Sequence, residues 1–409
     1  MSLDRRDFLR LAAAGGAGFV LLPGGVRAFA APGAQGAGGR RLVLLFLEGG
    51  NDGLNTVIPF EDALYQTARP KIGQRGASLV KLDEVTALHP QMAAWRAAWD
   101  AGQLAVLRGV GYGRPDRSHF VSRDIWHSGR RDDATRATGW VARALAREAG
   151  TAAALPPVAL GTDEAPLVLH GETHNGLTIS DLDAFRVQVG EGERAERQRA
   201  LDAGTGAGGG TSLADRIGAT ASAAYVTAEK LRLAVETIPE GGGYPENDLA
   251  ARLRLIARLC RAEGGPPVLW TRLGGFDTHA AQEGTHAALL GQLAGATAAF
   301  LADLARDGAD GRVLVLVYSE FGRRVRENGS AGTDHGAAAP MFALGGGVRG
   351  GLIGLPPDLS DLDNGDERPQ ADMRAVFSTA LRDWLGWRAD GLFDGGFADG
   401  RARVGYIAG

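Results

Sequence analysis

The chain has 409 residues, with 44 lysines and arginines against 48 aspartates and glutamates, so its formal net charge at pH 7 is −4. This length suits one large α/β domain or two smaller ones. Nucleic-acid-binding domains are usually basic, so the acidic balance argues against nucleic acid as the main partner.

The first 30 residues have the pattern of an export signal. Arg5-Arg6 is followed by Phe8-Leu9, and an apolar run then extends from Leu11 to Leu22. Spanning a bilayer takes about 20 apolar residues, so this run is too short to anchor the chain in a membrane. Ala28-Phe29-Ala30 places small residues where a signal peptidase cleaves. Residues 1–30 therefore predict a twin-arginine signal peptide, with the twin-arginine translocase as partner during export. The mature protein is expected to be periplasmic or secreted, without a membrane anchor.

Two stretches are predicted to be linkers from their composition. Residues 31–40 read APGAQGAGGR, which is typical of a flexible connection. Residues 190–212 begin with a run of charged residues and end in GTGAGGGTS, which predicts an exposed linker. We expect residues 41–409 to form a single domain that contains this second linker.

Short apolar runs alternate with helical patterns along the rest of the chain. The predicted strands are Leu42–Leu47, Leu104–Val110, Val158–Leu160, Val268–Arg272, Val313–Tyr318 and Met341–Leu344. The predicted helices are Gln91–Ala101, Trp140–Ala149, Leu213–Ile238, Leu249–Glu263, His286–Asp307 and Met373–Leu385. Unbroken apolar strands separated by amphipathic helices predict an α/β fold, with a mostly parallel central sheet and helices on both faces.

The only cysteine, Cys260, cannot form an intrachain disulfide. It shares one face of a predicted helix with Leu249, Leu253 and Ile256. This pattern predicts a thiol packed in the core and gives no indication of a reactive one.

Polar residues gather next to the predicted strands. Ligands of parallel α/β sheets bind beyond the carboxyl ends of the strands, so a site is expected there. The clusters are Glu48, Asn51, Asp52 and Asn55; Arg114, Asp116, Arg117, Ser118 and His119; Asp277, Thr278, His279 and Gln282; Ser319, Glu320, Arg323 and Arg324; and Asp334 with His335. Carboxylates, imidazoles and arginines are therefore expected to meet at one edge of the sheet.

Carboxylates and imidazoles on separate loops are the ligand types that bind divalent metals such as zinc, manganese or calcium. The predicted ligands are Asp52, Asp277, His279, Glu320, Asp334 and His335. Two ions about 3.5–4 Å apart can hold both oxygens of an in-line displacement. The sequence therefore predicts a centre of one or two divalent ions.

The same loops carry groups suited to a small anionic ester. Arg117 and Arg323 are predicted to hold the anion, since guanidinium groups bind such groups in bidentate fashion. His119 and Asn55 complete the predicted substrate-binding set. Ser118 precedes a predicted helix, where backbone N–H groups point toward an anion.

Several of these residues also fit purely structural roles. Ser118 suits a helix N-cap as well as a site, and Asp277-Thr278-His279 fits a turn closed by an Asx hydrogen bond. Glu320 suits an ordinary salt bridge with Arg323 or Arg324. The residues alone leave these alternatives open.

Five stretches in order, FLEGGNDGLNTVIPF, GRPDRSHF, GGFDTHAAQ, YSEFGRRVRENGSAGTDHG and FALGGGVRGG, resemble the DUF1501 family. Its members are exported bacterial proteins, usually with a twin-arginine signal, and their biochemical role is largely undefined. The family is grouped with the alkaline phosphatase-like superfamily of phosphatases, sulfatases and phosphoglycerate mutases. The resemblance covers essentially the whole mature chain and implies an alkaline phosphatase-like fold.

The superfamily resemblance implies roles for single positions. Asp52 matches the metal-binding aspartate after the first strand, and Ser118 is the nearest match to the serine or threonine nucleophile. Asp277 with His279 resembles an Asp and His pair, and His335 fits a later histidine. Where the superfamily has Asp-His after a late strand, this chain has Glu320-Phe321, so one metal position lacks its imidazole.

These observations predict an exported, metal-dependent hydrolase of phosphate or sulfate esters with Ser118 as nucleophile. The alternative is a non-catalytic periplasmic binding or assembly protein that keeps the fold. A serine hydrolase with a histidine relay is a third possibility, although the chain contains no G-x-S-x-G motif.

Overall fold

The computed structural model describes residues 39–148, 155–172, 175–180, 231–397, 400 and 402–408. The predicted signal peptide (1–30), most of the first linker, the second linker (190–212) and most of the predicted helix Leu213–Ile238 lie outside the described residues.

Among the described residues, a nine-stranded sheet runs in the order β11-β5-β10-β9-β1-β8-β6-β7, with β14 also paired to β5. The strands are β1 Arg41–Leu47, β5 Leu104–Gly111, β6 Val158–Leu160, β7 Leu177–Ile179, β8 Val268–Leu273, β9 Val313–Ser319, β10 Ala339–Leu344, β11 Gly351–Ile353 and β14 Ala371–Asp372. Every predicted strand is present, within two residues of its predicted ends. The short strands β7, β11 and β14 were not predicted.

One strand departs from the parallel arrangement. β1 pairs in parallel with β8 and β9, whereas β10 runs antiparallel to both β9 and β5. Consequently β10 begins at the edge where β1, β5, β8 and β9 end. The loop that precedes β10 therefore lies beside the loops that follow the parallel strands.

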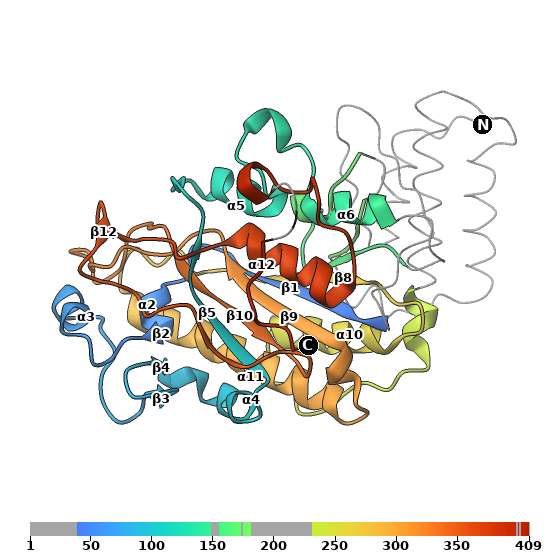
Figure 1. The fold of residues 1–409 in the computed structure, drawn as a ribbon. Helices are drawn as coiled ribbons and strands as arrows, with labels where there is room; N and C mark the ends of the chain where they lie inside the picture. The colour runs from blue at the N-terminus through green and yellow to red at the C-terminus, as the bar shows by residue number, and fades with distance from the viewer. Residues whose placement is uncertain are drawn as a thin grey trace, which may run out of the picture.

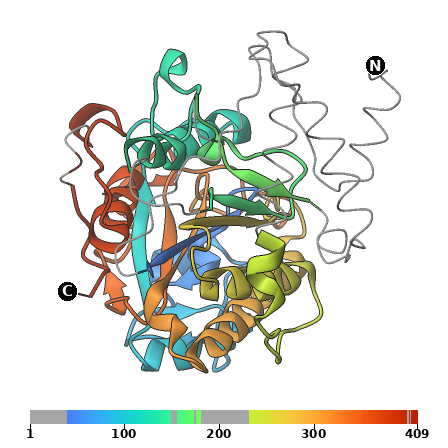
Figure 2. The same cartoon turned by 90° about the vertical axis from the view of Figure 1, so that its right-hand side faces the viewer.

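Both faces of the sheet are covered, as predicted. The side chains of β1 alternate, so that Val43, Leu45 and Leu47 enter one core cluster and Leu42, Leu44 and Phe46 enter the other. Helices α10 (Asp248–Arg261) and α11 (Gln282–Ala305) pack on the first face. Helices α5 (His119–Ser128), α6 (Trp140–Glu148) and α12 (Met373–Thr379) cover the second (Figures 1 and 2).

Two predicted helices are interrupted. The predicted helix Gln91–Ala101 is a 3-10 segment, Pro90–Trp95, followed by α4 (Arg96–Asp100), and the non-helical backbone at Met92 separates its turns. The predicted helix Met373–Leu385 is α12 followed by a π-helical turn over Ala380–Leu385. Hydrophobic periodicity identifies the buried faces of these helices correctly, but it does not reveal where an α-helix changes locally to a 3-10 or π-helix.

The predicted core thiol is confirmed. Cys260 lies in α10 and is buried in the same cluster as Leu249, Leu253 and Ile256. Burial raises the pKa of the Cys260 thiol to about 12. Because the thiolate is the reactive form, the thiol is inert at physiological pH.

Helix α11 is the one described helix long and apolar enough to cross a membrane. Leu290, Leu293, Phe300 and Leu304 on this helix are buried against the sheet. Its apolar character therefore follows from its place in the core.

Smaller elements lie beyond the main sheet. Strands β2 (Val57–Ile58), β4 (Ala87–Leu88) and β3 (Val80–Lys81) form a three-stranded sheet next to helices α2 (Gly53–Thr56) and α3 (Ala63–Ala68). Strands β12 (Leu362–Asp363) and β13 (Asp366–Glu367) form a hairpin. Together they extend the rim of the sheet where the polar loops lie.

Burial of Glu367 on β13 predicts a pH-dependent stability. Burial raises the pKa of Glu367 to about 7, and Arg69 opposes this only in part. The folded state then binds more protons than the unfolded state between the ordinary carboxyl pKa and pH 7, so stability falls as pH rises through that window. Glu367→Gln should remove this loss, worth about 1.4 kcal/mol per pKa unit, in denaturation curves at pH 5 and pH 8. Glu61→Gln, at an exposed carboxylate, is the control; equal pH dependence in both variants would contradict the prediction.

Candidate metal centre

Four segments meet at the rim of the sheet. The loops after β5, β8 and β9 bring His119, Asp277 and Arg323, and the loop before β10 brings His335. An isolated β-bridge joins Arg323 to His335, and Arg324 N donates to the carbonyl of Asp334 at 2.9 Å. Backbone pairing therefore fixes the fourth segment against the third.

Asp277 is the centre of this group. Its Oδ1 accepts a hydrogen bond from Arg323 at 2.7 Å and lies 2.9 Å from His279 Nε2 and 3.1 Å from His335 Nε2. Its Oδ2 lies 3.4 Å from His119 Nε2. Three imidazoles thus direct the same ring nitrogen toward one carboxylate.

The other nitrogen of each imidazole has an oxygen partner. The pairs are His119 Nδ1 with Glu320 Oε1 at 2.8 Å, His335 Nδ1 with the Arg117 carbonyl at 2.7 Å, and His279 Nδ1 with Asp334 Oδ1 at 3.3 Å. Metal-bound histidines usually donate their second N–H to a carboxylate or carbonyl, which orients the ring and fixes its tautomer. This arrangement turns the three Nε2 atoms inward, where those of His279 and His335 lie 2.9 Å apart.

The residues present fit a divalent metal ion. Ligand atoms of His119, Asp277 and His335 all lie within 4.8 Å of one another. His119 Nε2 is buried and makes no hydrogen bond, although Asp277 is near. His335 Nε2 lies 2.9 Å from His279 Nε2 and 3.1 Å from Asp277 Oδ1, while its Nδ1 lies 2.7 Å from the Arg117 carbonyl. Nitrogen donors with one carboxylate are typical zinc ligands. His279 lies beside this trio, with its Nε2 2.9 Å from both Asp277 Oδ1 and His335 Nε2.

Electrostatics favour the charged form of the carboxylate. Partial burial raises the pKa of Asp277, but Arg323 and His335 outweigh that effect and lower it to about 2. The hydrogen bond to Glu320 raises the pKa of His119, against the opposing effect of burial. Burial lowers the pKa of His335. Asp277 is thus ionised at any working pH.

Phe321, directly after Glu320, lies against two of the imidazoles. Its ring is buried and lies 4.9 Å from the His119 ring and 4.6 Å from the His335 ring, centroid to centroid. Gly50 has a φ of +73°, and a Cβ there would lie 2.2 Å from the Phe321 ring. Phe321 therefore supports the two imidazoles from one side, and Gly50 makes room for it.

Glu320 was predicted as a metal ligand, but in the structure its carboxylate hydrogen-bonds to one of the histidines. It is 1% exposed and accepts hydrogen bonds from Gly49 N, Gly50 N and Ser319 Oγ as well as from His119. With these donors around its two oxygens, Glu320 orients His119. The structure therefore does not support direct coordination by Glu320.

Glu320→Gln should weaken metal affinity by about 10–100-fold, because a carboxamide cannot accept all these donors and His119 loses its orientation. Competition with a chromophoric chelator measures this change. Glu48→Gln is the matched control, because Glu48 pairs with Arg272 and Arg123 outside the centre. Equal affinities in the two variants would show that Glu320 does not position His119.

Asp52 and Asn55 were predicted as a metal ligand and a substrate-binding residue, and the structure places them in a separate buried network. Asp52 is 1% exposed, and its Oδ2 accepts from Arg69 at 2.6 Å and from Gln282 at 2.5 Å. Asn55 bonds Tyr65, Arg69 and the Ile72 carbonyl. Asp52 Oδ1 has no partner among the described residues, but Asp52 is not part of the trio. The geometry supports one ion.

The two arginines predicted to bind the substrate anion already form hydrogen bonds or ion pairs within the protein. Arg323 is 3% exposed and donates to the carbonyls of Gly49, Gly50, Phe276 and Thr333 as well as to Asp277. Arg117 is ion-paired with Asp366. Arg323 is therefore buried with every guanidinium nitrogen already bonded, and it holds the loops of the rim together. His119 lies among the metal-type ligands and not in a substrate-binding place.

Ser118 is exposed at the N-cap position of α5, directly before His119. Its side chain makes no capping bond, while its backbone N–H donates to Asp116. It makes no hydrogen bond to a histidine among the described residues, so nothing here activates it by a relay. The hydroxyl stays accessible beside the centre, and its role as nucleophile remains a prediction.

Two arginines that the sequence did not single out lie close to this rim. Arg123 follows His119 by four residues and therefore shares its face of α5. Arg123 and Arg272 lie 3.6 Å and 2.6 Å from the oxygens of Glu48, and both are half-exposed. The sequence could have indicated them by position, because Arg123 lies one helical turn into α5 and Arg272 lies near the end of β8.

Comparison with known proteins finds one matching family and several solved structures of low similarity. The model of the family described as "Protein of unknown function (DUF1501)" matches residues 115–382. No curated protein matches the chain.

Three solved structures resemble the fold at low identity. The C-terminal periplasmic domain of EcEptC from Escherichia coli, in complex with Zn, is 10% identical with a TM-score of 0.40, over 85% of this chain and 83% of that one. The phosphonate monoester hydrolase of Agrobacterium radiobacter is 12% identical with a TM-score of 0.36, over 85% and 74%. A protein in the alkaline phosphatase superfamily from Vibrio parahaemolyticus is 9% identical with a TM-score of 0.35, over 90% and 77%.

Proposed function

The chain belongs to the DUF1501 family of proteins of unknown function, and from this premise we propose that it is an exported, metal-dependent hydrolase of phosphate or sulfate esters. The observation that carries the proposal is the convergence of three imidazole Nε2 atoms on Asp277, each ring held by a partner at its other nitrogen. Such preorganisation is characteristic of metal centres.

The residues that would hold the ion are His119, His279, His335 and Asp277. When bound, a divalent ion supplies Lewis-acid polarisation of an ester oxygen and lowers the pKa of a bound hydroxyl or water. Glu320 and the Arg117 carbonyl keep the rings oriented. Arg323 holds Asp277 in place and ionised.

Ser118 is proposed as the nucleophile. Its hydroxyl is exposed at the N-cap position of α5, directly before His119. The N-terminus of a ten-residue helix also favours a negative charge, through its free N–H groups and its dipole. Both features suit an anionic ester whose central atom is attacked by the serine oxygen.

Arg123 and Arg272 are proposed to contact the substrate anion in place of Arg117 and Arg323. Arg123 lies 3.6 Å from Glu48 and 4.0 Å from Asp124, and Arg272 lies 2.6 Å from Glu48. Their half-exposed guanidinium groups leave N–H donors for a phosphate or sulfate oxygen. This arrangement favours a small anionic ester over a neutral one.

The location is proposed from the sequence. Arg5-Arg6 and the Ala28-Phe29-Ala30 cleavage pattern support export by the twin-arginine pathway to the periplasm or beyond. This pathway carries folded proteins, which suits a chain whose proposed ligands come from three separate segments.

Elemental analysis of the purified protein, combined with a panel of phosphate and sulfate esters, tests the proposal. We expect one divalent ion per chain and an ester hydrolysis that chelator abolishes and added metal restores. Ser118→Ala should lower turnover by at least about 100-fold and should still bind the metal ion. Turnover that persists in this variant would place the attack on water and remove Ser118 from the mechanism.

A non-catalytic metal-binding protein is the second candidate, favoured by Phe321 in place of the superfamily imidazole. It predicts the same stoichiometric ion and no turnover of any ester in the panel. A folded protein that takes up no ion from zinc, manganese or calcium solutions would contradict both candidates.

A further inference from the structure

A pocket of about 470 Å³ opens at the edge of the sheet, lined by residues outside the metal centre. Strand β11 pairs with residues 105–107 of β5, and β14 pairs with residues 110–111. The pocket lies at Arg108, between these two short strands. The chain leaves the sheet after β11, forms the β12–β13 hairpin and returns as β14, so the pocket is built into the fold.

The walls of the pocket are largely apolar. They include Leu107, Ile353, Leu355, Pro356 and Val404. Leu355 is 74% exposed, although most large apolar side chains of the chain are buried. A pocket of this size with apolar walls suits a small organic molecule, and a few polar groups would fix its orientation.

Arg108 is the buried cation of this pocket. It is 7% exposed, and its Nε is buried without a hydrogen-bond partner. Its nearest carboxylate is Asp83, whose Oδ2 lies 3.7 Å from an outer guanidinium nitrogen, beyond hydrogen-bond reach. A buried charge is normally paired and hydrogen-bonded, so Arg108 lacks the anion that its surroundings require.

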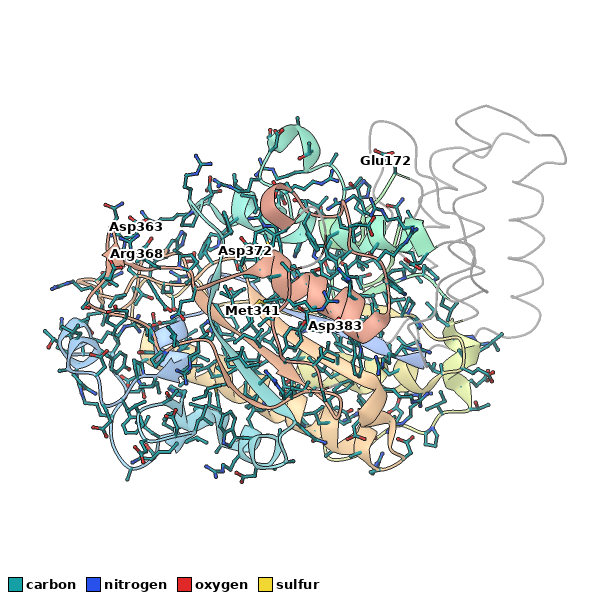
Figure 3. The ribbon with its side chains drawn as sticks, in the orientation of Figure 1. Glu172, Met341, Asp363, Arg368, Asp372 and Asp383 are labelled. Atoms are coloured by element: carbon teal, nitrogen blue, oxygen red, sulfur yellow. The ribbon has the colours of Figure 1, made fainter. Side chains whose placement is uncertain are left out.

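Other charged groups in the lining restrict which anion fits. Asp358, Asp361 and Glu367 also line the pocket. Arg368, at its rim, is already paired with Asp361 and lies close to Asp363 (Figure 3). A dianionic phosphate would be repelled by these carboxylates, whereas a planar carboxylate carries one charge and matches the guanidinium fork.

We propose that this pocket binds a monocarboxylic acid with an apolar chain, whose carboxylate pairs with Arg108 and whose chain lies along Leu107, Ile353 and Leu355. The site is separate from the metal centre and does not depend on the proposed hydrolysis.

Calorimetric titration of the metal-loaded protein with decanoate, decan-1-ol and inorganic phosphate tests the proposal. We expect saturable decanoate binding at least about ten times tighter than decan-1-ol, because only the acid pairs with the guanidinium. Phosphate should not displace decanoate. Equal affinity for acid and alcohol, no saturable binding, or displacement by phosphate would each overturn the proposal.

Variants assign the binding to the pocket. Arg108→Met should abolish the preference for the acid and keep or raise thermal stability, because it removes an undercompensated buried charge. Arg368→Gln, at the paired rim arginine, is the matched control and should retain the preference. Leu355→Asp changes an exposed position and therefore should not impair folding, but it should abolish decanoate binding. Unchanged binding in Leu355→Asp would overturn the proposal even if Arg108→Met failed to fold.

Discussion

Replacing Asp277 by alanine should lower the affinity for the metal ion by roughly 100-fold or more. This loss is larger than that caused by changing a residue that only hydrogen-bonds to a ligand. Asp277 is the one carboxylate that all three histidines of the centre approach within 3.4 Å. Without it the proposed ligand set loses its only carboxylate, and three imidazoles remain to hold a divalent cation. Elemental analysis after dialysis and chelator competition measure the loss.

The fold should survive this substitution, because Arg323 keeps four backbone carbonyls as acceptors. Asp363→Ala, at an exposed carboxylate on the β12–β13 hairpin, is the control and should bind metal as the unmodified protein does. Full metal retention in Asp277→Ala would mean that the cluster of histidines is not a metal centre.

Arg323→Met should lower the free energy of unfolding by about 3–5 kcal/mol, the range for breaking a buried charge network. The side chain of Arg323 joins the loop after β1, through Gly49 and Gly50, to Phe276 after β8 and to Thr333 before β10. Methionine preserves the volume but removes the Arg323 donors from the buried carbonyls of Gly49, Gly50 and Thr333, whereas the Phe276 carbonyl keeps Thr278 N. An unsatisfied buried acceptor is costly.

Urea denaturation in the presence of chelator measures this effect without any contribution from bound metal. Arg324→Met is the matched neighbour, because its guanidinium lies 3.8 Å from Asp366 at a partly exposed position. Exposed pairs of that kind are worth about 0–1 kcal/mol. If both variants unfold at the same urea concentration, Arg323 does not hold the rim together.

The sequence predicted the architecture well because its signals are local. Runs such as Leu42–Leu47 and Val313–Tyr318 can only be buried strands, and β1 and β9 occupy those positions. The direction of β10 was not predictable, since an apolar run looks the same in a parallel and an antiparallel pair. Short edge strands such as β11 carry too few residues for a periodic pattern.

The site was predicted at the level of loops, and less well at the level of single roles. The topological rule brought His119, Asp277 and His335 to one rim. The rule could not distinguish residues that would bind the ion directly from residues that hydrogen-bond to those ligands. That distinction depends on which neighbouring groups already form hydrogen bonds with each side chain. Glu320 accepts from two backbone N–H groups and Arg323 donates to four carbonyls, and neither contact leaves a trace in the local sequence.

The antiparallel entry of β10 has a consequence for the order of events during synthesis. His335 reaches the centre only from the segment before β10, more than 200 residues after His119 leaves the ribosome. Until that segment emerges, the nascent polypeptide holds an incomplete set of the proposed ligands. The proposed centre is thus complete only after the segment before β10 has been synthesised.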